Sequence, residues 1–179
     1  WHQEATEQRG LENLRNTANA LPVLRRDDVK ELFQRQAVIS PVELESRYEV
    51  YSEQYTLAVE VEAKVALSIV QTQISPAVQK HLGSLARSIS QQQAVGLNPD
   101  QRTLQHAAEL HQRMQDQINA LHDELHQLHH GDTTASMNHA ANVLLPRLLQ
   151  LRDVVDGLEG LVDDDRWPLP SYREMLFVS

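Results

Sequence analysis

The sequence predicts an all-α fold: a helical bundle with a long central helix and an antiparallel, coiled-coil-like helical hairpin. The chain has 179 residues and only six glycines, and it is rich in Leu, Ala, Gln and Glu, which favour helix over strand. Apolar residues recur at alternating steps of three and four over long stretches, which is the period of an amphipathic helix. No stretch shows the two-residue alternation of a half-buried strand.

The first helix is expected over residues 3–17, with Leu11 and Leu14 on one side. Residues 17–22, which include a proline, are expected to form a connector to the next helix. The chain starts at Trp1, without a methionine, in a segment that already has a helical pattern. This start predicts that the sequence is a piece of a longer protein.

A short second helix is predicted over residues 27–36. Its first turn carries Asp27 and Asp28, whose negative charges suit the positive end of the helix dipole. The residues expected on its buried face are Val29, Leu32 and Phe33.

The long central helix has the clearest start signal in the chain. Ser40 is placed as the N-cap, Pro41 as the first helical residue, and Glu43 as the partner in a capping box. Because Pro76 lacks an amide donor, the helix is expected to stop or kink near Ile74. The predicted buried stripe is Leu44, Tyr48, Tyr51, Tyr55, Ala58, Val65 and Ile69, widened by Val59, Ala63, Ala66 and Val70.

The helical pattern resumes over residues 77–93, and the hairpin follows it. Residues 98–99, Asn-Pro, are expected to start a helix, and residues 131–132, Gly-Asp, to end it and turn the chain. In the second hairpin helix Pro146 is expected to introduce a kink, and the aspartates at 163–165 lie unfavourably at the negative pole. The heptad seams are Leu104, Ala107, His111, Met114, Ile118, Leu121, Leu125 and Leu128, and then Met137, Ala141, Leu144, Leu148, Leu151, Val155, Leu158 and Val162.

These elements predict three parts. Residues 1–97 form a helical segment that continues from an upstream domain, residues 98–165 form the antiparallel hairpin, and residues 166–179 form a tail. The tail is expected to dock on the protein because it is rich in apolar side chains. Those side chains are Trp167, Pro168, Pro170, Tyr172, Met175, Leu176 and Phe177.

Composition excludes several classes of function. A net charge of −9 is poorly suited to nucleic acid or to anionic membrane surfaces, and Arg25-Arg26 is too small a basic cluster to change this. The absence of cysteine excludes disulfides, thiolate metal sites and a cysteine nucleophile. No apolar run approaches the ~20 residues that span a bilayer, and no signal peptide precedes the first helix. We therefore expect a cytoplasmic protein with no nucleic acid and no membrane partner.

Four histidines suggest a metal site, which we weigh against a solvated helix face. His122, His126, His129 and His130 lie within nine residues, and the pairs at i and i+4 share a helix face. Two imidazoles at this spacing can bind zinc. However, the order His-Asp-Glu-Leu-His differs from the His-Glu-x-x-His motif. The leucine seam also places these histidines largely on the side of the helix that faces solvent. We favour the solvated face and assign no metal ligand.

No other residues form a self-sufficient active site. Glu53, Glu60 and Glu62 are candidate acid–base carboxylates, but the spacing identifies no partner for them, so we expect a polar face or an interface. The three tyrosines of residues 48–55 are expected in the core and not in a ligand stack. The sequence has no phosphate-binding glycine loop and no nucleophile elbow. We therefore assign no catalytic, cofactor-binding or metal-binding residue.

Several segments, in order, resemble the C-terminal region of type III glutamine synthetases. Residues 45–49, Glu-Ser-Arg-Tyr-Glu, and residues 53–55, Glu-Gln-Tyr, resemble the most recognisable late helix of that family. Ser52 and residues 173–175 depart from the family pattern. The other matching segments are Trp1–Ala5, Arg9–Arg15, Thr17–Pro22, Leu32–Phe33, Glu60–Ala63, Thr72–Ala77, Trp167–Tyr172 and Leu176–Phe177.

The resemblance implies a ligase of nitrogen metabolism that joins glutamate and ammonia at the expense of ATP, with Mg or Mn ions. In that family the catalytic motifs lie upstream, so the fragment itself is expected to be inactive. The family forms cytoplasmic assemblies of two stacked hexameric rings, and the implied partners are the chain's own upstream catalytic domain and other copies of the chain.

Two functions therefore stand as hypotheses. The first is a non-catalytic C-terminal region of a glutamine synthetase that supports the core and oligomer assembly. The alternative is a free-standing helical adaptor or scaffold that binds a partner through the heptad hairpin at residues 98–165.

Overall fold

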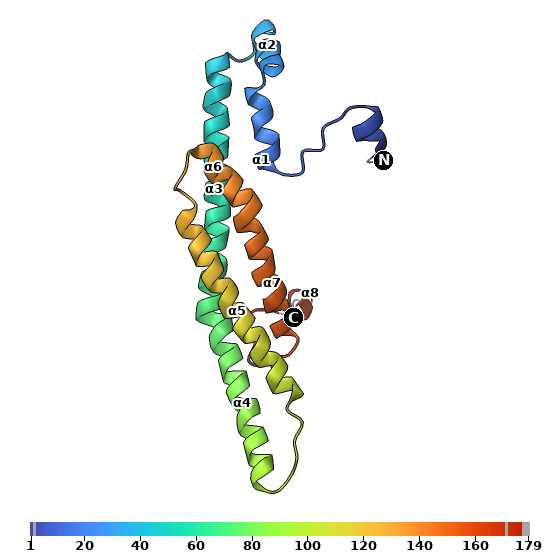
Figure 1. Cartoon of the computed structure of the whole chain (residues 1–179), viewed down its shortest axis with the longest axis vertical. Helices are drawn as coiled ribbons and strands as arrows, with labels where there is room; N and C mark the ends of the chain where they lie inside the picture. Colours follow the sequence, from blue (N-terminus) through green and yellow to red (C-terminus); the bar gives the residue numbers. More distant parts are fainter. Residues whose placement is uncertain (2, 171, 177–179) are drawn as a thin grey trace. The chain divides into compact units, whose positions relative to one another are not determined.

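The computed structural model describes residues 1, 3–170 and 172–176, and all of its regular elements are helices (Figure 1). This confirms the predicted all-α class. The α-helices are α1 Thr17–Ala20, α2 Asp27–Arg35, α3 Pro41–Ile69, α4 Ser75–Ala94, α5 Arg102–Gln127, α6 Thr133–His139, α7 Leu145–Glu159 and α8 Tyr172–Leu176. Three π segments, η1 Glu4–Gln8, η3 Val70–Ile74 and η4 Ala140–Leu144, and a 3-10 helix, η2 Leu21–Arg25, complete the elements. No helix in the described part combines the length and apolar character that crossing a bilayer requires.

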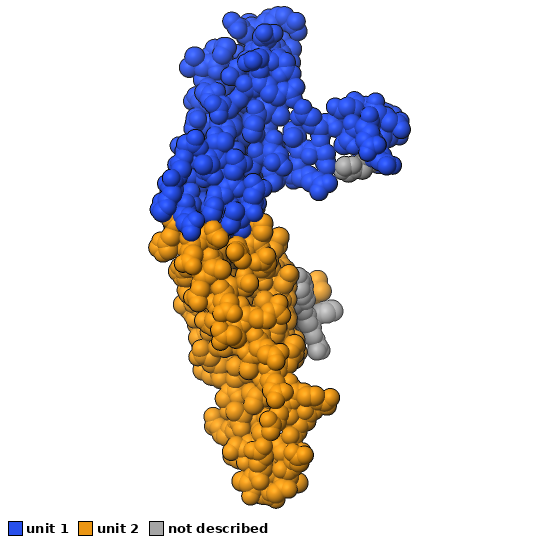
Figure 2. Space-filling view, viewed as in Figure 1, with its two compact units in different colours: residues 1–61, 127–144 blue, residues 62–126, 145–179 orange. Residues whose placement is uncertain are grey.

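The chain folds into two compact units, which Figure 2 colours separately. Unit 1 contains residues 1–61 and 127–144, and unit 2 contains residues 62–126 and 145–179. Each unit combines two separate ranges of the chain, and one boundary between the units lies inside α3. The three predicted parts, in contrast, are each one continuous range. The predicted boundaries at residues 97 and 165 therefore stay a prediction.

The predicted helix over residues 3–17 is wrong. Only η1 is helical at the start, and the chain leaves it through Gly10, whose φ of +64° lies in the left-handed region that glycine tolerates. Leu11 and Leu14, expected on a buried side, are exposed. The glycine interrupts the helix before a long enough apolar face can form.

The predicted connector at residues 17–22 is helical instead. Asn16 caps α1, because its side-chain oxygen accepts a hydrogen bond from the amide of Asn19 at 2.8 Å. The 3-10 helix η2 follows directly and carries the proline near its start, where no amide donor is needed. The second predicted helix is confirmed as α2, but Leu32 on its expected buried face is 48% exposed.

The capping box that starts the long helix is confirmed. The amide of Ser40 donates to Glu43 Oε2 at 2.8 Å, and the amide of Glu43 donates to Ser40 Oγ at 3.3 Å. The Ser40 hydroxyl also donates to the same carboxylate at 2.7 Å. These hydrogen bonds, first from the Ser40 backbone and then from its hydroxyl, lower the pKa of Glu43 below its usual 4.5.

The lowered pKa of Glu43 predicts a pH dependence of stability. A depressed carboxyl pKa contributes stability that is complete above the unfolded pKa and is lost as the pH falls through the folded one. The free energy of unfolding of wild type should therefore exceed that of Glu43→Gln by a constant amount above pH 4.5, and the difference should shrink below it. Urea titrations across this pH range measure the difference. Ser40→Ala, which keeps the backbone donor, should reduce the effect only in part, and an unchanged difference at low pH would contradict the assignment.

Both prolines inside long helices are preceded by a π segment. The helix was expected to stop or kink near Ile74. It does not stop there, but runs through η3 into α4, with Pro76 in the first turn of α4. The amide of Ser75 donates to the carbonyl of Val70, five residues back. The same arrangement recurs at η4, which ends two residues before Pro146. A π turn adds one residue to a turn of the helix. It therefore accommodates a proline, whose ring needs space and whose nitrogen cannot donate a hydrogen bond.

The buried face of the long helix differs from the predicted stripe. Ser52 and Thr56 are buried, whereas Tyr51 is 41% exposed and Val65 is also exposed. Thr56 satisfies its hydroxyl by donating to the carbonyl of Ser52 at 2.9 Å. The buried side chains recur every three or four residues and are Leu44, Tyr48, Ser52, Thr56 and Val59 in unit 1, then Ala63, Leu67, Val70 and Ile74 in unit 2.

In unit 2, the segment formed by η3 and α4 runs antiparallel to α5. Gln71 in η3 contacts His122 on α5 at 3.2 Å, and Ser75 at the start of α4 contacts Gln115 on α5 at 3.1 Å. The residue numbers rise along one helix as they fall along the other, which is the signature of antiparallel packing. Ser75 is buried, whereas Gln71 and His122 are exposed.

Helices α5 and α7 of unit 2 also run antiparallel, which agrees with the predicted hairpin. Arg147 forms an ion pair with Glu124 at 3.8 Å, and a Cβ atom at Gly157 would lie 3.4 Å from Leu110 Cδ1. The absence of a side chain at Gly157 thus allows the two helices to approach closely. Most of the predicted seam residues are buried, namely Ala107, Met114, Ile118, Leu121, Leu151, Val155, Leu158 and Val162 in this unit.

Three predicted helix ends need correction. Helix α5 begins at Arg102 and not at residues 98–99, because the Asp100 side chain accepts from the amide of Arg102 at 2.9 Å. Asp132 is the N-cap of α6, where it accepts from the amide of Ala135 at 2.7 Å, and not the end of α5. Helix α7 ends at Glu159, so the aspartates at 163–165 lie beyond its negative pole.

Among the described residues of the tail after α7, the partly buried side chains lie near its beginning. Trp167 is half-buried, and Leu169 lines a groove of unit 2 formed mainly by α3 and α7. Leu176 in α8 is 75% exposed, and Met175 is exposed as well. The side chains of Tyr172 and Phe177, which were also expected to dock, lie outside the described part of the structure.

Candidate functional site

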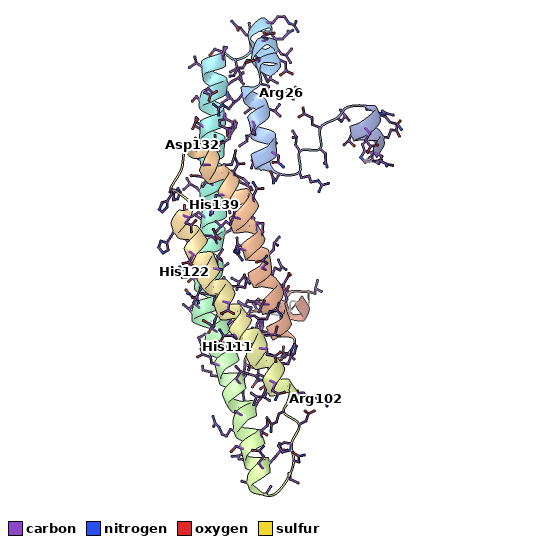
Figure 3. All side chains as sticks on the ribbon, in the orientation of Figure 1. Arg26, Arg102, His111, His122, Asp132 and His139 are labelled. Carbon is purple, nitrogen blue, oxygen red and sulfur yellow. The ribbon has the colours of Figure 1, made fainter. Side chains whose placement is uncertain are left out.

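Two of the four histidines lie on α5 in unit 2. The rings of His122 and His126 are stacked, with centroids 6.4 Å apart and an interplanar angle of 23°. His122 Nε2 is 3.2 Å from the side-chain amide nitrogen of Gln71. Figure 3 labels His122 on the flank of α5. Stacked imidazoles with an amide partner form a helix-surface arrangement and supply at most two neighbouring nitrogen ligands.

The other two histidines belong to unit 1. His129 Nε2 forms an ion pair with Glu60 Oε2 at 3.1 Å, and the Glu60 side chain is largely buried. His130 is exposed in the turn after α5. Within the described residues, no three His, Cys, Asp or Glu side chains are grouped so that they could hold a metal ion. His122 and His129 therefore contact other helical segments, through Gln71 and Glu60.

The three candidate carboxylates are not brought together. Glu60 pairs with His129, whereas Glu53 is exposed on the rim of a pocket of about 280 Å³ in unit 1. Glu62 lines a different groove, in unit 2. An acid–base pair requires two groups within reach of one substrate, and these residues do not provide it.

The tyrosines have three different environments. Tyr48 is 1% exposed, and its hydroxyl is 2.8 Å from Thr134 Oγ1. The guanidinium carbon of Arg25 lies 4.8 Å from the centre of its ring, which is cation–π distance. Tyr55 packs at the edge of the same core, and Tyr51 is exposed. The core position of Tyr48 agrees with the expectation for these rings, and Tyr51 departs from it.

The Arg25-Arg26 pair is neutralised by carboxylates. Arg25 Nε lies 3.0 Å from Glu45, and the Arg26 guanidinium lies 2.6 Å from both Glu12 and Asp28. Asp28 and then Glu12 raise the pKa of Arg26, and Arg26 in turn lowers the pKa of Asp28. These arginines therefore join the N-terminal segments to each other and to α3.

Several exposed apolar side chains of unit 1 were not anticipated by the sequence predictions. Val50, Leu57 and Val61 are exposed on α3 and, at spacings of seven and four, lie along one side of the helix. Leu32 and Val38 are exposed on and after α2. The seven-and-four spacing of the α3 residues is visible in the sequence, but the predicted buried stripe of tyrosines lies on the same helix and obscures it. Exposed apolar side chains mark an interaction site where they form a contiguous patch.

Comparisons with known proteins agree with the predicted family. The family described as "Glutamine synthetase C-terminal domain" matches residues 1–93. The Type-3 glutamine synthetase of Dictyostelium discoideum is 30% identical over 98% of the chain. Glutamine synthetases of Bacteroides fragilis and Butyrivibrio fibrisolvens are 26% and 24% identical, each over 99% of the chain.

The alignments also define how much of these relatives the chain represents. It spans about a quarter of their length, with 25%, 25% and 26% of each relative covered. The match extends through residues 78–165, where the sequence itself showed only a helical pattern. A free-standing adaptor is not supported by these similarities. The chain belongs to the glutamine synthetase C-terminal domain family.

Proposed function

We propose that this chain is the non-catalytic C-terminal helical region of a glutamine synthetase, and that it supports the core and the oligomeric assembly of that enzyme. The observation that carries the proposal is the alignment of 98% of the chain with one quarter of a glutamine synthetase. The complete enzyme joins glutamate and ammonia at the expense of ATP.

The exposed apolar side chains of unit 1 support a packing role. Leu57 and Val61 on α3 and Leu32 on α2 expose apolar surface, and burying such surface is favourable by about 25 cal/mol per Å². The occupant we propose is the catalytic part of the same enzyme. A homo-oligomer of stacked rings and a cytoplasmic location, which the family resemblance implies, belong to the same proposal.

ATP and Mg or Mn ions are assigned to the catalytic part and not to this chain. Within the described residues, no cluster of His, Asp or Glu fits a metal ion, and the sequence holds no glycine-rich phosphate loop. Divalent metals that bind nucleotides require oxygen ligands, usually carboxylates. No catalytic step is therefore derived for residues of this chain.

The isolated chain should form no glutamine. The test supplies glutamate, ammonium, ATP and Mg²⁺ or Mn²⁺ and measures glutamine and released phosphate. The control is the Bacteroides fragilis glutamine synthetase, which shares 26% identity with the chain, in the same assay. Glutamine formation by the chain alone would refute the proposal. Sequencing the gene upstream of the Trp1 codon gives a second test, and the absence of a synthetase reading frame there would also refute it.

A further inference from the structure

A cationic groove in unit 2 is not used by the proposed packing role. It follows the exposed side of α4 and has a volume of about 660 Å³. Lys80 and Arg87 project from α4, and Arg166 reaches the groove from the segment after α7. No carboxylate lines it, although the whole chain carries a net charge of −9. The groove is thus a local concentration of positive charge on an acidic protein.

The spacing along α4 allows these side chains to converge on one point. Lys80 and Arg87 are seven residues apart, which is two turns and about 10.5 Å of helix rise. Ser84 lies between them, four residues after Lys80 and three before Arg87, so all three share one helix side. At Gly83 a Cβ atom would meet nothing within 4 Å, so the space above this turn is open. Two long cationic side chains and a serine hydroxyl therefore border one open position.

Arg166 is held in place by contacts that do not use all of its donors. Its Nε lies 3.2 Å from Asp163 Oδ2, and its Nη1 donates to the carbonyl of Lys80 at 3.5 Å. Asp163 is itself positioned against the buried ring of His81, 3.4 Å from Nδ1. The guanidinium is thus anchored beside Lys80 before any ligand arrives, which reduces the entropy lost on binding.

The other two cations are available. No ion pair joins Lys80 or Arg87 to a carboxylate within the described residues, and both side chains are exposed. Ser84 and Ser88 add hydroxyl donors, whereas proline is the only apolar residue type in the lining. Lysine, arginine and hydroxyl donors without an aromatic wall fit a compact oxyanion better than a nucleoside base.

We propose that this groove binds a phosphate group above Gly83 and Ser84, held by Lys80, Arg87 and Arg166. The ligand class is inorganic phosphate or a small phosphorylated metabolite. The absence of carboxylates in the lining separates the groove from a magnesium–nucleotide site, which needs oxygen ligands for the metal. This inference does not rest on the proposed packing role.

Titration of the whole chain with inorganic phosphate tests the site. At constant ionic strength, calorimetry should give saturable binding with one phosphate per chain, and Lys80→Gln and Arg87→Gln should each weaken it about tenfold or more, the loss expected for a charge-assisted hydrogen bond. Both side chains are exposed, so circular dichroism should show unchanged helix content. Phosphoserine as a second probe distinguishes free phosphate from a phosphorylated metabolite.

The matched control is Arg113→Gln, an equal loss of charge at an exposed position on α5 in the same unit. It should change the dissociation constant less than twofold. An equal loss in the control would show general attraction by surface charge and would overturn the proposal. Absence of saturable binding by wild type, or unchanged binding by both α4 variants, would overturn it as well.

Discussion

Tyr48→Ala is expected to reduce the free energy of unfolding by about 3–5 kcal/mol, the range for removing a large buried aromatic side chain. The ring is 1% exposed and belongs to the unit 1 core with Ala18, Met137 and Ala141. The substitution leaves a cavity among side chains from α1, α3, α6 and η4. It also removes the ring beneath Arg25 and the hydroxyl partner of Thr134.

Two further tyrosine variants make this expectation specific. Tyr48→Phe removes only the hydroxyl bonded to Thr134 and should cost about 0.5–1.5 kcal/mol. Tyr51→Ala, three residues along the same helix, removes a ring that is 41% exposed and should cost far less than Tyr48→Ala. Urea unfolding followed by circular dichroism measures all three. A loss for Tyr51→Ala equal to that for Tyr48→Ala would contradict the assignment of Tyr48 to the core.

Features fixed by local chemistry were predicted well from the sequence. The capping box of Ser40 and Glu43 was identified correctly because all of its partners lie within four residues. The seam that includes Met114 and Leu158 was correct because a heptad repeat specifies one face over several turns. The antiparallel arrangement of α5 and α7 followed from the same repeat.

Features that depend on tertiary contacts were predicted less well. Ser52 and Thr56 face the interior although they are polar, because the elements packed on α3 cover that side and Thr56 satisfies its hydroxyl on the Ser52 carbonyl. The helix continues past Pro76 because a π segment removes the conflict that the proline would create in a regular α-helix. Neither arrangement follows from the apolar pattern alone.

For function too, local sequence features were predictable and features that depend on tertiary contacts were not. The family was predictable because short ordered segments such as residues 45–49 resemble it. The cationic groove was not, because Arg166 is separated from Lys80 by 86 residues and joins it only through the fold. The i and i+4 histidine spacing supplies two ligands, and no third His, Cys, Asp or Glu is grouped with them among the described residues. The assignment of no metal ligand stays a prediction.

Leu158→Ala is the second substitution with a large expected effect, a loss of about 2–5 kcal/mol. Leu158 on α7 is completely buried, next to Gly157, where α7 approaches Leu110 of α5 closely. Close packing at this position leaves little freedom for neighbouring atoms to fill the space of the removed side chain. The residual cavity therefore adds to the lost transfer free energy.

The same helix offers the matched control. Leu149 is also on α7 but is 63% exposed, so Leu149→Ala makes the identical chemical change at a surface position and should alter the free energy of unfolding by less than about 0.5 kcal/mol. Both variants replace leucine with alanine, which raises helix propensity slightly in each case, so propensity cancels in the comparison. The difference between them isolates burial in the unit 2 core. Equal destabilisation by the two variants would contradict the burial of Leu158 in the core of unit 2.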